Sequence, residues 1–503
     1  MIEIIKKNRS LIFLILLCFG LRAALALSGS ISFHYDMSRD AFAAREIWHD
    51  FDLKVLGPPS SHPGLHHGVG YYYLIAFFYW LGQGDPRAVG VFLAFLSSLT
   101  IIPLYLLAKD LFGSRKWGWL AGILFVFSFE AIQYGTWLSN PAPAVLTICL
   151  FFYGLRLWQK NKPWGLALAL IAAAMSTHFE LFLGSLFFLL PIFLIFYKPK
   201  IKLKPLLMGI FASGLVFGSL FLATFHFQTS GQVLESFQGV TQRGAGKAIK
   251  PFLDYYYQLK NLFEINFSPG FPKLGALLLG LSLLTGFKSG FLILGLLSRL
   301  PVFFFGGHSS SFILLGLLIP AILLVVRFLK QLFSWSKLTA LCLLGVILGT
   351  NLSFLVRNLN RGQFHLVIPQ DMILSRQLQL VDQAYQIAAG EEFSINSLTL
   401  PLWTNTTWTY LFSWYGLKKY GYLPQFYGHD QIGLPGDDFL PEVREPSKIT
   451  FLILEDPQGI PGHLYEAELS SEDGRSKLIR EYYFGRLKLQ HRQGLFAHKR
   501  IND

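Results

Sequence analysis

Long apolar runs recur along the first 356 residues of this 503-residue chain, and they constrain its fold more than any other feature. Runs such as residues 11–27 and 181–197 approach the roughly 20 apolar residues that a helix needs to cross a bilayer. Charged residues make up 15% of the chain, against about 25% in an average soluble domain. The pattern predicts a polytopic α-helical membrane protein and excludes a cytosolic globular protein, a disordered chain and a coiled coil.

Using about 20 residues per span as a guide, we expect eleven transmembrane helices. They cover residues 10–27, 88–108, 117–137, 142–158, 164–178, 180–197, 206–226, 273–287, 290–306, 311–329 and 338–356. Between 273 and 306 a second interpretation is open, because Lys288 and Arg299 interrupt the apolar pattern. If that stretch were one span, everything after it would lie on the other side of the membrane.

The positive charge is concentrated in this apolar part of the chain. Residues 1–356 contain 28 Lys and Arg against 13 Asp and Glu. These cations fall mainly in alternate connections between spans, and the positive-inside rule assigns those connections to the cytoplasm. Residues 28–87, 227–272 and the segment from 357 onward are then extracytoplasmic. Membrane topology accounts for the basic balance, so we expect membrane lipids as partners and no nucleic acid.

The composition changes after residue 356, where no apolar run is long enough to cross a bilayer. Helical spacing at 377–389 and strand patterns at 393–400 and 449–454 predict a small α/β fold. We therefore expect two domains. Residues 1–356 form a transmembrane domain that includes an external loop at 28–87 with juxtamembrane helices, and residues 357–503 form an extracytoplasmic α/β domain. Residues 71–80, rich in aromatic side chains, suit the bilayer interface rather than a span.

The loop at 28–87 contains the densest polar cluster of the apolar part. On a helix that starts near Asp36, residues 36, 39 and 40 share one face, so Asp36, Arg39 and Asp40 would converge. A structural interpretation has Asp36 capping the helix and Arg39 paired with a neighbouring acid. On spacing alone, the cluster does not identify an enzyme.

Three histidines follow within six residues, at His62, His66 and His67. They are able to bind a metal ion or a phosphate, and a solvated glycine-rich loop explains them equally well. No cofactor is certain from the sequence. A divalent metal is possible, although no group of residues has strong ligand spacing.

These residues resemble a family, the bacterial family 39-like glycosyltransferases of the GT-C fold, related to aminoarabinose transferases and protein O-mannosyltransferases. In that family an Asp-Glu-x-x-Arg-Tyr-Ala-x-x-Ala-Arg-Glu type segment follows the first span, and a Lys-Pro-Pro-Leu-Tyr-Tyr-Trp type segment comes later. The residues that fall on or near the two patterns are Asp36, Arg39, Ala41, Ala44, Arg45, Glu46, Tyr72 and Tyr73. The chain departs from the patterns in two places, because Met37 replaces the second acid and His67 stands near the lysine.

The resemblance implies transfer of a sugar from a polyprenyl-phosphate donor to a lipid, glycan or protein acceptor at the extracytoplasmic membrane face. The phosphate leaving group is a stable anion, so it needs cations around it, and the acceptor needs a base. Asp36 matches the base, with Asp40 in reserve. The substrate-binding candidates in this loop are Arg39, Arg45, Glu46, His66, His67 and Tyr72.

Polar residues within spans or at their ends add further candidates, because an ionisable side chain facing lipid is costly. They are Glu130, Asn140, His178, Glu180 and His308. For each ionisable one, the alternative is a buried pair or an interfacial residue that reaches water. Asn140 stands where related enzymes often carry an acid, which makes it a candidate for acceptor binding.

Two other classes of function remain open. A transporter or flippase of a lipid-linked glycan would use polar span residues as a path, yet inverted repeats and interrupted helices are not evident in the sequence. A non-catalytic anchor for the C-terminal residues would not need eleven spans.

Overall fold

The computed structural model describes residues 9–60, 65–227, 250–304, 314–358 and 371–495. The chain divides into two compact units. The first comprises Met1–Ala24, Lys54–Tyr72 and Val91–Arg357, and the second comprises Leu25–Leu53, Tyr73–Gly90 and Asn358–Asp503. Three of the boundaries between the units fall within the helices α2 (Arg9–Leu27), α4 (Gly70–Leu81) and α5 (Pro86–Leu99). The other two fall between Leu53 and Lys54 and between Arg357 and Asn358.

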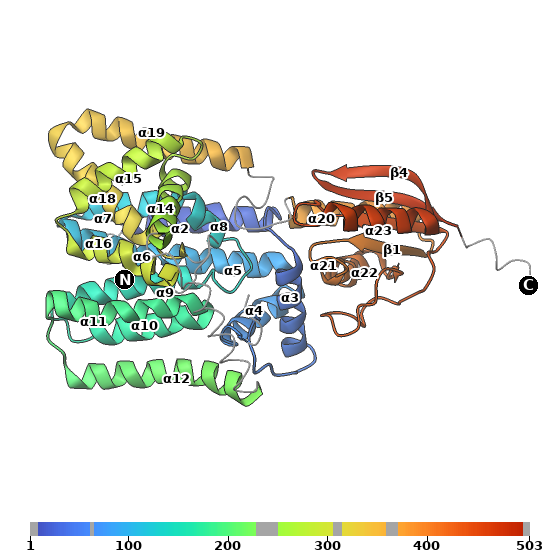
Figure 1. The fold of residues 1–503 in the computed structure, drawn as a ribbon, viewed down its shortest axis with the longest axis horizontal. Helices are drawn as coiled ribbons and strands as arrows, with labels where there is room; N and C mark the ends of the chain where they lie inside the picture. The colour runs from blue at the N-terminus through green and yellow to red at the C-terminus, as the bar shows by residue number, and fades with distance from the viewer. Residues whose placement is uncertain (1–8, 61–64, 228–249, 305–313, 359–370, 496–503) are drawn as a thin grey trace, which may run out of the picture. The chain divides into compact units, whose positions relative to one another are not determined.

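The described elements of the first unit are helices joined by loops, and α10 packs between α9 and α12 (Figure 1). Its remaining elements, in chain order, are α6 (Ile101–Phe112), α7 (Arg115–Phe127), α8 (Phe129–Tyr134), α9 (Ala144–Gln159), α10 (Gly165–Phe179), η1 (Leu181–Ser185), α11 (Leu186–Tyr197), α12 (Leu203–Phe227), α14 (Lys250–Phe267), α15 (Pro272–Gly286), α16 (Gly290–Leu296), η2 (Leu297–Arg299), α17 (Leu300–Phe304), α18 (Leu318–Trp335) and α19 (Lys337–Asn358).

Within the described residues, five helical segments are long and apolar enough to cross a membrane. They are Arg9–Leu27, Pro86–Phe112, Leu203–Leu220, Leu318–Trp335 and Lys337–Asn358. A sixth arises only if α14 and α15 form one span, and they are bent by 107°. Each of the eleven predicted spans overlaps helix, but several of these helices have 10–17 residues. The predicted number of eleven spans is therefore not confirmed, whereas the prediction of an integral membrane protein is confirmed.

The predicted helix at 117–137 is broken at Ser128 into α7 and α8. The buried side chain of Arg22 explains the break. Its Nη2 donates to Phe125 O at 3.2 Å and its Nη1 to Val126 O at 3.4 Å. The last carbonyls of a helix lack partners within it, and a cation is favourable there. Arg22 thus supplies the hydrogen bonds that α7 loses by ending early.

Helix α14 corrects a second expectation, because residues 227–272 were predicted as a connection between spans. Residues 250–267 of that connection are helical, and residues 228–249 lie outside the described part of the chain. Tyr255, Leu259, Leu262 and Phe263 are buried on one side of α14. An apolar stripe of this spacing is typical of an amphipathic helix, and the polar residues between its members obscured it.

The second unit contains a five-stranded sheet with the order β2-β1-β3-β5-β4. The strands are β1 (Phe393–Leu398), β2 (Gln425–Phe426), β3 (Ile449–Leu454), β4 (Ser476–Phe484) and β5 (Leu487–Gly494). β1 is parallel to β2 and β3, while β5 is antiparallel to β3 and β4. β1 and β3 lie where strands were expected. β4 was not predicted, because it has no regular alternation: Lys477, Leu478, Ile479 and Arg480 are all exposed.

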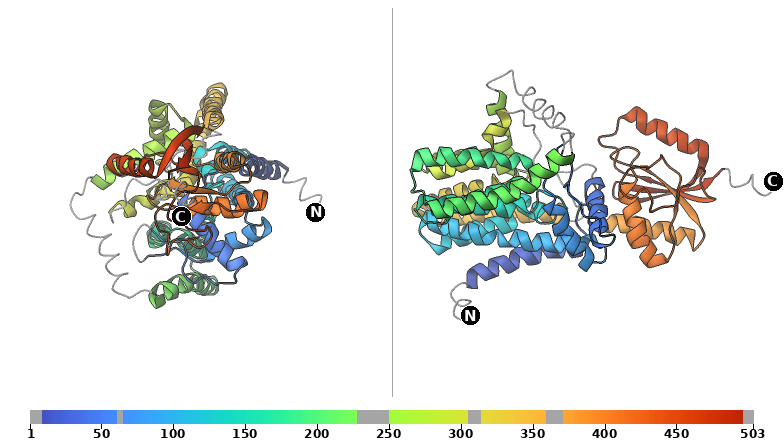
Figure 2. Two further views of the ribbon diagram at one scale, coloured as in Figure 1. Left: turned by 90° about the vertical axis from the view of Figure 1, so that its right-hand side faces the viewer. Right: turned by 90° about the horizontal axis from the view of Figure 1, so that it is seen from below.

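Helices cover both faces of this sheet (Figures 1 and 2). They are α20 (Leu374–Ala388), α21 (Thr406–Leu411), η5 (Phe412–Gly416), α22 (Leu417–Tyr420) and α23 (Gly462–Arg475), and the unit also includes α3 (Tyr35–Trp48). Alternate residues of a strand point to opposite faces. Phe393 accordingly contacts Tyr385 of α20 on one face, and Leu398 packs near Leu469 of α23 on the other.

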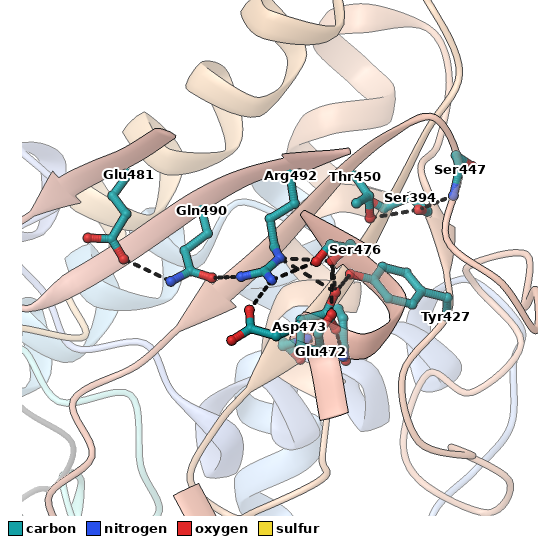
Figure 3. A network of polar contacts seen from close by, with 12 residues as sticks. Ser394, Tyr427, Ser447, Thr450, Glu472, Asp473, Ser476, Glu481, Gln490 and Arg492 are labelled. Carbon is teal, nitrogen blue, oxygen red and sulfur yellow. Dashed lines mark hydrogen bonds and ion pairs between the residues drawn. The ribbon is translucent and has the colours of Figure 1, made fainter. Parts of the chain in front are cut away.

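A buried polar network joins α23 to the two C-terminal strands (Figure 3). Arg492 is 2% exposed, and its Nε donates to Ser476 Oγ at 2.8 Å. Its Nη1 donates to Gln490 Oε1 at 2.6 Å, and Tyr427 Oη donates to Glu472 Oε1 at 2.7 Å. Buried polar groups require such partners. These contacts are consistent with a structural role for the network.

Candidate functional site

Helix α3 carries the first group of candidate residues and is fixed by its buried face within the second unit. Ser38 Oγ lies 3.1 Å from Thr407 Oγ1. The ring of Phe42 lies 5.1 Å from that of Tyr410 and 5.0 Å from that of Phe439. These contacts leave the opposite side of the first turns of α3 available to carry polar side chains.

The chain just before α3 is also held. Phe33 N donates to Met372 O at 2.9 Å, and Gln377 Nε2 donates to Phe33 O at 2.8 Å. Both partners lie at the start of α20 or immediately before it. The beginning of α3 is therefore positioned by backbone and side-chain hydrogen bonds rather than by its own sequence alone.

The convergence predicted for Asp36, Arg39 and Asp40 is present in the structure. Arg39 Nη1 donates to Asp36 Oδ1 at 2.8 Å, and its Nη2 donates to Asp40 Oδ1 at 2.7 Å. The Asp36 side chain is 53% exposed and that of Asp40 only 2%. Arg39 pairs with neighbouring acids as the structural interpretation proposed. The two carboxylates nevertheless differ sharply in their access to solvent.

The proposed capping role of Asp36 is wrong. The residue at the N-cap position is His34, which makes no side-chain capping bond, and Asp36 lies inside the first turn. A carboxylate there is favourable because the N-terminus of a helix is partly positive. Burial lowers the pKa of His34 and so disfavours its charged form. Asp36 is thus left with Arg39 as its ion-pair partner.

Arg45 and Glu46 lie near the other end of α3. The guanidinium of Arg45 lies 4.5 Å from the ring centroid of Phe439. Arg45 follows Asp36 by nine residues, which at 3.6 residues per turn places it on the opposite face of the helix. The structure therefore brings Arg39 to Asp36 but does not bring Arg45 there.

In the first unit, the histidine-containing loop packs against the end of α10. The Nε2 atom of His178 accepts a hydrogen bond from Gly70 N at 3.0 Å, and His178 O accepts one from Gly68 N at 2.7 Å. His67 is buried, and His66 Nδ1 lies 2.8 Å from Gly57 O. The structure thus brings the segment around His67 together with His178.

Two further candidates are buried in this unit. Tyr72 is 6% exposed in the first turn of α4. Asn140 donates through its Nδ2 to Phe179 O at 2.7 Å. Asn140 therefore links the segment before α9 to the end of α10, which gives it a structural contact in addition to any role in binding.

Glu130 is anchored by a side chain from α14. Asn266 Nδ2 donates to Glu130 Oε2 at 3.0 Å, and Asn266 Oδ1 accepts from Glu130 N at 3.0 Å. Ser128 Oγ also donates to Asn266 Oδ1. The carboxylate of Glu130 is therefore held in one position by an uncharged partner.

Glu180 follows α10 directly, is 3% exposed and interacts electrostatically with Arg299. Arg299 is 1% exposed and donates through its Nη1 to Ser185 Oγ at 2.6 Å. Arg22 and Arg299 were not among the candidates predicted from the sequence. The signal was present, because each is a charged residue inside an apolar run, where such a residue marks a specific interaction.

His308 and His62 lie outside the described residues. Within the described ranges, no group of three or more His, Cys, Asp or Glu side chains has an arrangement that holds a metal ion.

Comparisons with known proteins agree with this architecture. Residues 66–222 match the model of the dolichyl-phosphate-mannose-protein mannosyltransferase family. The structure of ArnT from Cupriavidus metallidurans bound to undecaprenyl phosphate aligns with a TM-score of 0.56 and 11% identity, covering 95% of this chain and 97% of that one. This chain has the GT-C fold. The resemblance of this GT-C chain to family 39-like glycosyltransferases is thereby confirmed.

A structure of the same ArnT in the apo state aligns with a TM-score of 0.42 and 12% identity, covering 94% of this chain and 96% of that one. No curated protein sequence matches this GT-C chain.

Proposed function

We propose that this protein transfers a sugar from a polyprenyl-phosphate donor to an acceptor at the extracytoplasmic face of the cell membrane. One observation carries the proposal. In a chain with the GT-C fold, the exposed carboxylate of Asp36 is held at the start of α3 by Arg39 at 2.8 Å. A base that takes the proton of the acceptor hydroxyl has to be fixed in position and accessible to the acceptor. The Asp36 carboxylate is both.

Asp36 acts as the base, and Asp40 is the reserve candidate. The difference in exposure, 53% against 2%, favours Asp36 because an acceptor hydroxyl has to reach it. Arg39 lies between two carboxylates, so the three side chains together carry a net negative charge. Such a cluster is better suited to orienting Asp36 than to binding a phosphate. Arg39 is therefore a positioning residue in this proposal.

The reaction is a single displacement. The acceptor oxygen forms a bond to the anomeric carbon as the bond from that carbon to the phosphate oxygen breaks, and the acceptor proton passes to the Asp36 carboxylate. The products are the glycosylated acceptor and the free polyprenyl phosphate, with inversion at the anomeric carbon. The leaving group departs as a stable anion, so cations and hydrogen-bond donors serve it better than a general acid.

Donor binding is assigned to residues outside the Asp36 cluster. The solved relative, ArnT, is bound to undecaprenyl phosphate, and a lipid phosphate of that kind is the proposed carrier here. The residues proposed to bind substrate are Arg45, Glu46, His66, His67, Tyr72, Glu130, Asn140, His178, Glu180 and His308. No metal ligand is assigned.

The alternative function, a transporter or flippase of a lipid-linked glycan, is not favoured. The matching family model describes a mannosyltransferase family, and no observation on the described residues favours transport.

A turnover assay tests the proposal. Full-length protein in nanodiscs would be given a panel of radiolabelled polyprenyl-phosphate sugars together with membrane lipids as acceptors, and release of free lipid phosphate would be followed. We expect Asp36→Asn to lower turnover by about 10²–10⁴-fold. Asp50→Asn is the matched control, because Asp50 is also exposed and pairs with His49 just after α3. Equal turnover in both variants would exclude Asp36 as the base.

A further inference from the structure

Helix α8 presents a polar face inside the helical first unit. Glu130, Gln133 and Tyr134 are spaced i, i+3 and i+4, so their side chains lie on one side of the helix. All three are buried, with exposures of 8%, 6% and 2%. A polar helix face buried among apolar helices requires partners for its donors and acceptors.

Part of this face is without such partners. Both polar ends of the Gln133 amide, the hydroxyl of Tyr134 and the indole nitrogen of Trp137 are buried and have no hydrogen-bond partner among the described residues. Glu130, by contrast, is bound by Asn266. On this face, the groups without partners therefore belong to residues 133–137. They follow Glu130, whose position is fixed by Asn266.

The side chains of Gln133, Tyr134 and Trp137 together match the chemistry of a sugar ring. The Gln133 amide offers both an acceptor and donors, and the Tyr134 hydroxyl does the same, whereas the Trp137 indole only donates. Hydroxyl groups of a sugar are complementary to such a mixed set. The rings of Tyr134 and Trp137 lie 5.6 Å apart, and each combines an apolar body with a polar end.

The charges nearby restrict which sugar fits. Gln133, Tyr134 and Trp137 are uncharged, and the ionisable residue on the same helix face is the acid Glu130. The cation of Arg22 lies beside α8, but it already donates to main-chain carbonyls such as Phe125 O and Ala131 O. A sugar carboxylate bound at this face would therefore be buried without a cation free to pair with it among the described residues, which is costly. The local charge therefore excludes an acidic sugar and accepts one that carries only hydroxyl groups.

We propose that Gln133, Tyr134 and Trp137 form a binding site for the hydroxyl groups of a non-acidic sugar, the one carried by the lipid-linked substrate. This inference rests on the proposed function and adds to it the residues that recognise the sugar and the chemical class of that sugar. Gln133 makes the central contacts, since both ends of its amide are available.

Binding to three lipids tests the inference. Full-length protein in nanodiscs would be titrated with undecaprenyl phosphate, undecaprenyl phosphate-linked glucose and undecaprenyl phosphate-linked glucuronic acid. The wild type is expected to bind the glucose lipid at least tenfold more tightly than the glucuronic acid lipid. Gln133→Leu is expected to lower affinity for the glucose lipid about tenfold, the effect of losing hydrogen bonds to a ligand, and to leave affinity for bare undecaprenyl phosphate unchanged.

Two further variants distinguish a loss of sugar binding from a loss of folding. Tyr134→Phe removes a single oxygen and is expected to lower affinity for the glucose lipid about threefold to tenfold. Gln159→Leu is the matched control, because Gln159 is a glutamine of the same unit whose Oε1 accepts from Arg156 Nη1 at 2.6 Å. Gln159→Leu is expected to leave all three affinities unchanged. The melting temperature of Gln133→Leu without ligand should equal or exceed that of the wild type, because no protein hydrogen bond is lost.

Several outcomes would overturn the inference while sparing the proposed function. These are an unchanged glucose-lipid affinity in both Gln133→Leu and Tyr134→Phe, an equal loss for the glucose lipid and for the bare phosphate, and equal binding of the glucose and glucuronic acid lipids by the wild type. If the wild type binds none of the three lipids, the proposed lipid-linked donor fails, and the inference that rests on it fails with it.

Discussion

The imidazole of His178 and the backbone of Gly70 are joined by a hydrogen bond of 3.0 Å from Gly70 N to His178 Nε2. The same ring lies so close to Gly68 that a Cβ atom placed there would come within 2.2 Å of it. Gly68 N also donates to His178 O at 2.7 Å. The segment after His67 and the end of α10 therefore meet at a distance that only glycine permits.

Gly68→Ala is expected to destabilise the protein. The added methyl group would overlap the His178 ring, and overpacking of this kind typically costs about 1–3 kcal/mol. Thermal unfolding in detergent would measure the loss. Gly20→Ala in α2 is the control, because no atom lies within 4 Å of its added Cβ. The double variant Gly68→Ala with His178→Ala should regain part of the lost stability, and failure to do so would contradict the proposed overlap.

Arg22→Met should lower stability strongly, by about 3 kcal/mol or more, because it leaves buried carbonyl groups without donors. Those carbonyls are Phe125 O and Val126 O, in the last turn of α7 just before the break at Ser128. Unfolding monitored in detergent is again the measurement. Arg87→Met is the comparison, since Arg87 is 38% exposed and pairs with Asp85, and an exposed pair contributes only about 0–1 kcal/mol. Similar losses in both variants would show that the buried contacts of Arg22 are unimportant.

Glu130 and Asn266 are expected to be energetically coupled. Asn266→Leu removes the amide that binds the Glu130 carboxyl group and leaves that buried group without its hydrogen-bond partner, which is more costly than losing both groups. Adding Glu130→Met to Asn266→Leu should therefore restore stability. A double-mutant cycle on unfolding free energies should give a coupling of about 1–3 kcal/mol. Additive effects would indicate that the two side chains do not interact.

The stability of the second unit is expected to depend on pH because of the buried carboxyl group of Glu455. Burial raises the pKa of Glu455 to about 8, opposed by hydrogen bonds from Leu400 N and Trp408 Nε1. The folded state therefore holds a proton that the unfolded state releases above its ordinary pKa of about 4.5. Stability is fully present below that value, falls as the pH rises from about 4.5 to 8 and then levels off. The slope is at most about 1.4 kcal/mol per pH unit.

Hydrogen exchange of the full-length protein measures this dependence. Peptides covering β1 and β3 should exchange faster at pH 8 than at pH 6 after correction for the intrinsic exchange rate. In Glu455→Gln the difference should largely disappear, because the amide does not titrate. Protection that is constant between pH 6 and 8 in the wild type would contradict the raised pKa.

Local patterns predicted the helix near Asp36, the convergence of Asp36 with Arg39 and two strands of the sheet. Each of these features depends on residues close together in the sequence. The break at Ser128 was missed because the apolar pattern runs through it without interruption. Its cause, Arg22, lies more than 100 residues earlier in the chain, and a distance of that kind cannot be read from periodicity.

The residues of the α8 face were missed for a different reason. The cost of an ionisable side chain facing lipid singles out Glu130, and the resemblance to related enzymes singles out Asn140, but neither criterion applies to Gln133. A neutral amide in an apolar run carries no charge penalty, so its position alone does not indicate a function. Its importance follows from the absence of a protein partner for Gln133 in the described residues, and only the folded structure reveals that absence.

The hydrogen bond between Ser38 and Thr407 spans 369 positions of the chain. At a synthesis rate of about 5–20 residues per second, α3 leaves the ribosome roughly 20–70 s before the residues against which it packs. During that interval the apolar side chains of Phe33 and Phe42 lack their C-terminal neighbours, Tyr410 among them. The helix that carries Asp36 reaches its final environment only when synthesis is nearly complete, so a chain that stops before residue 372 cannot assemble it.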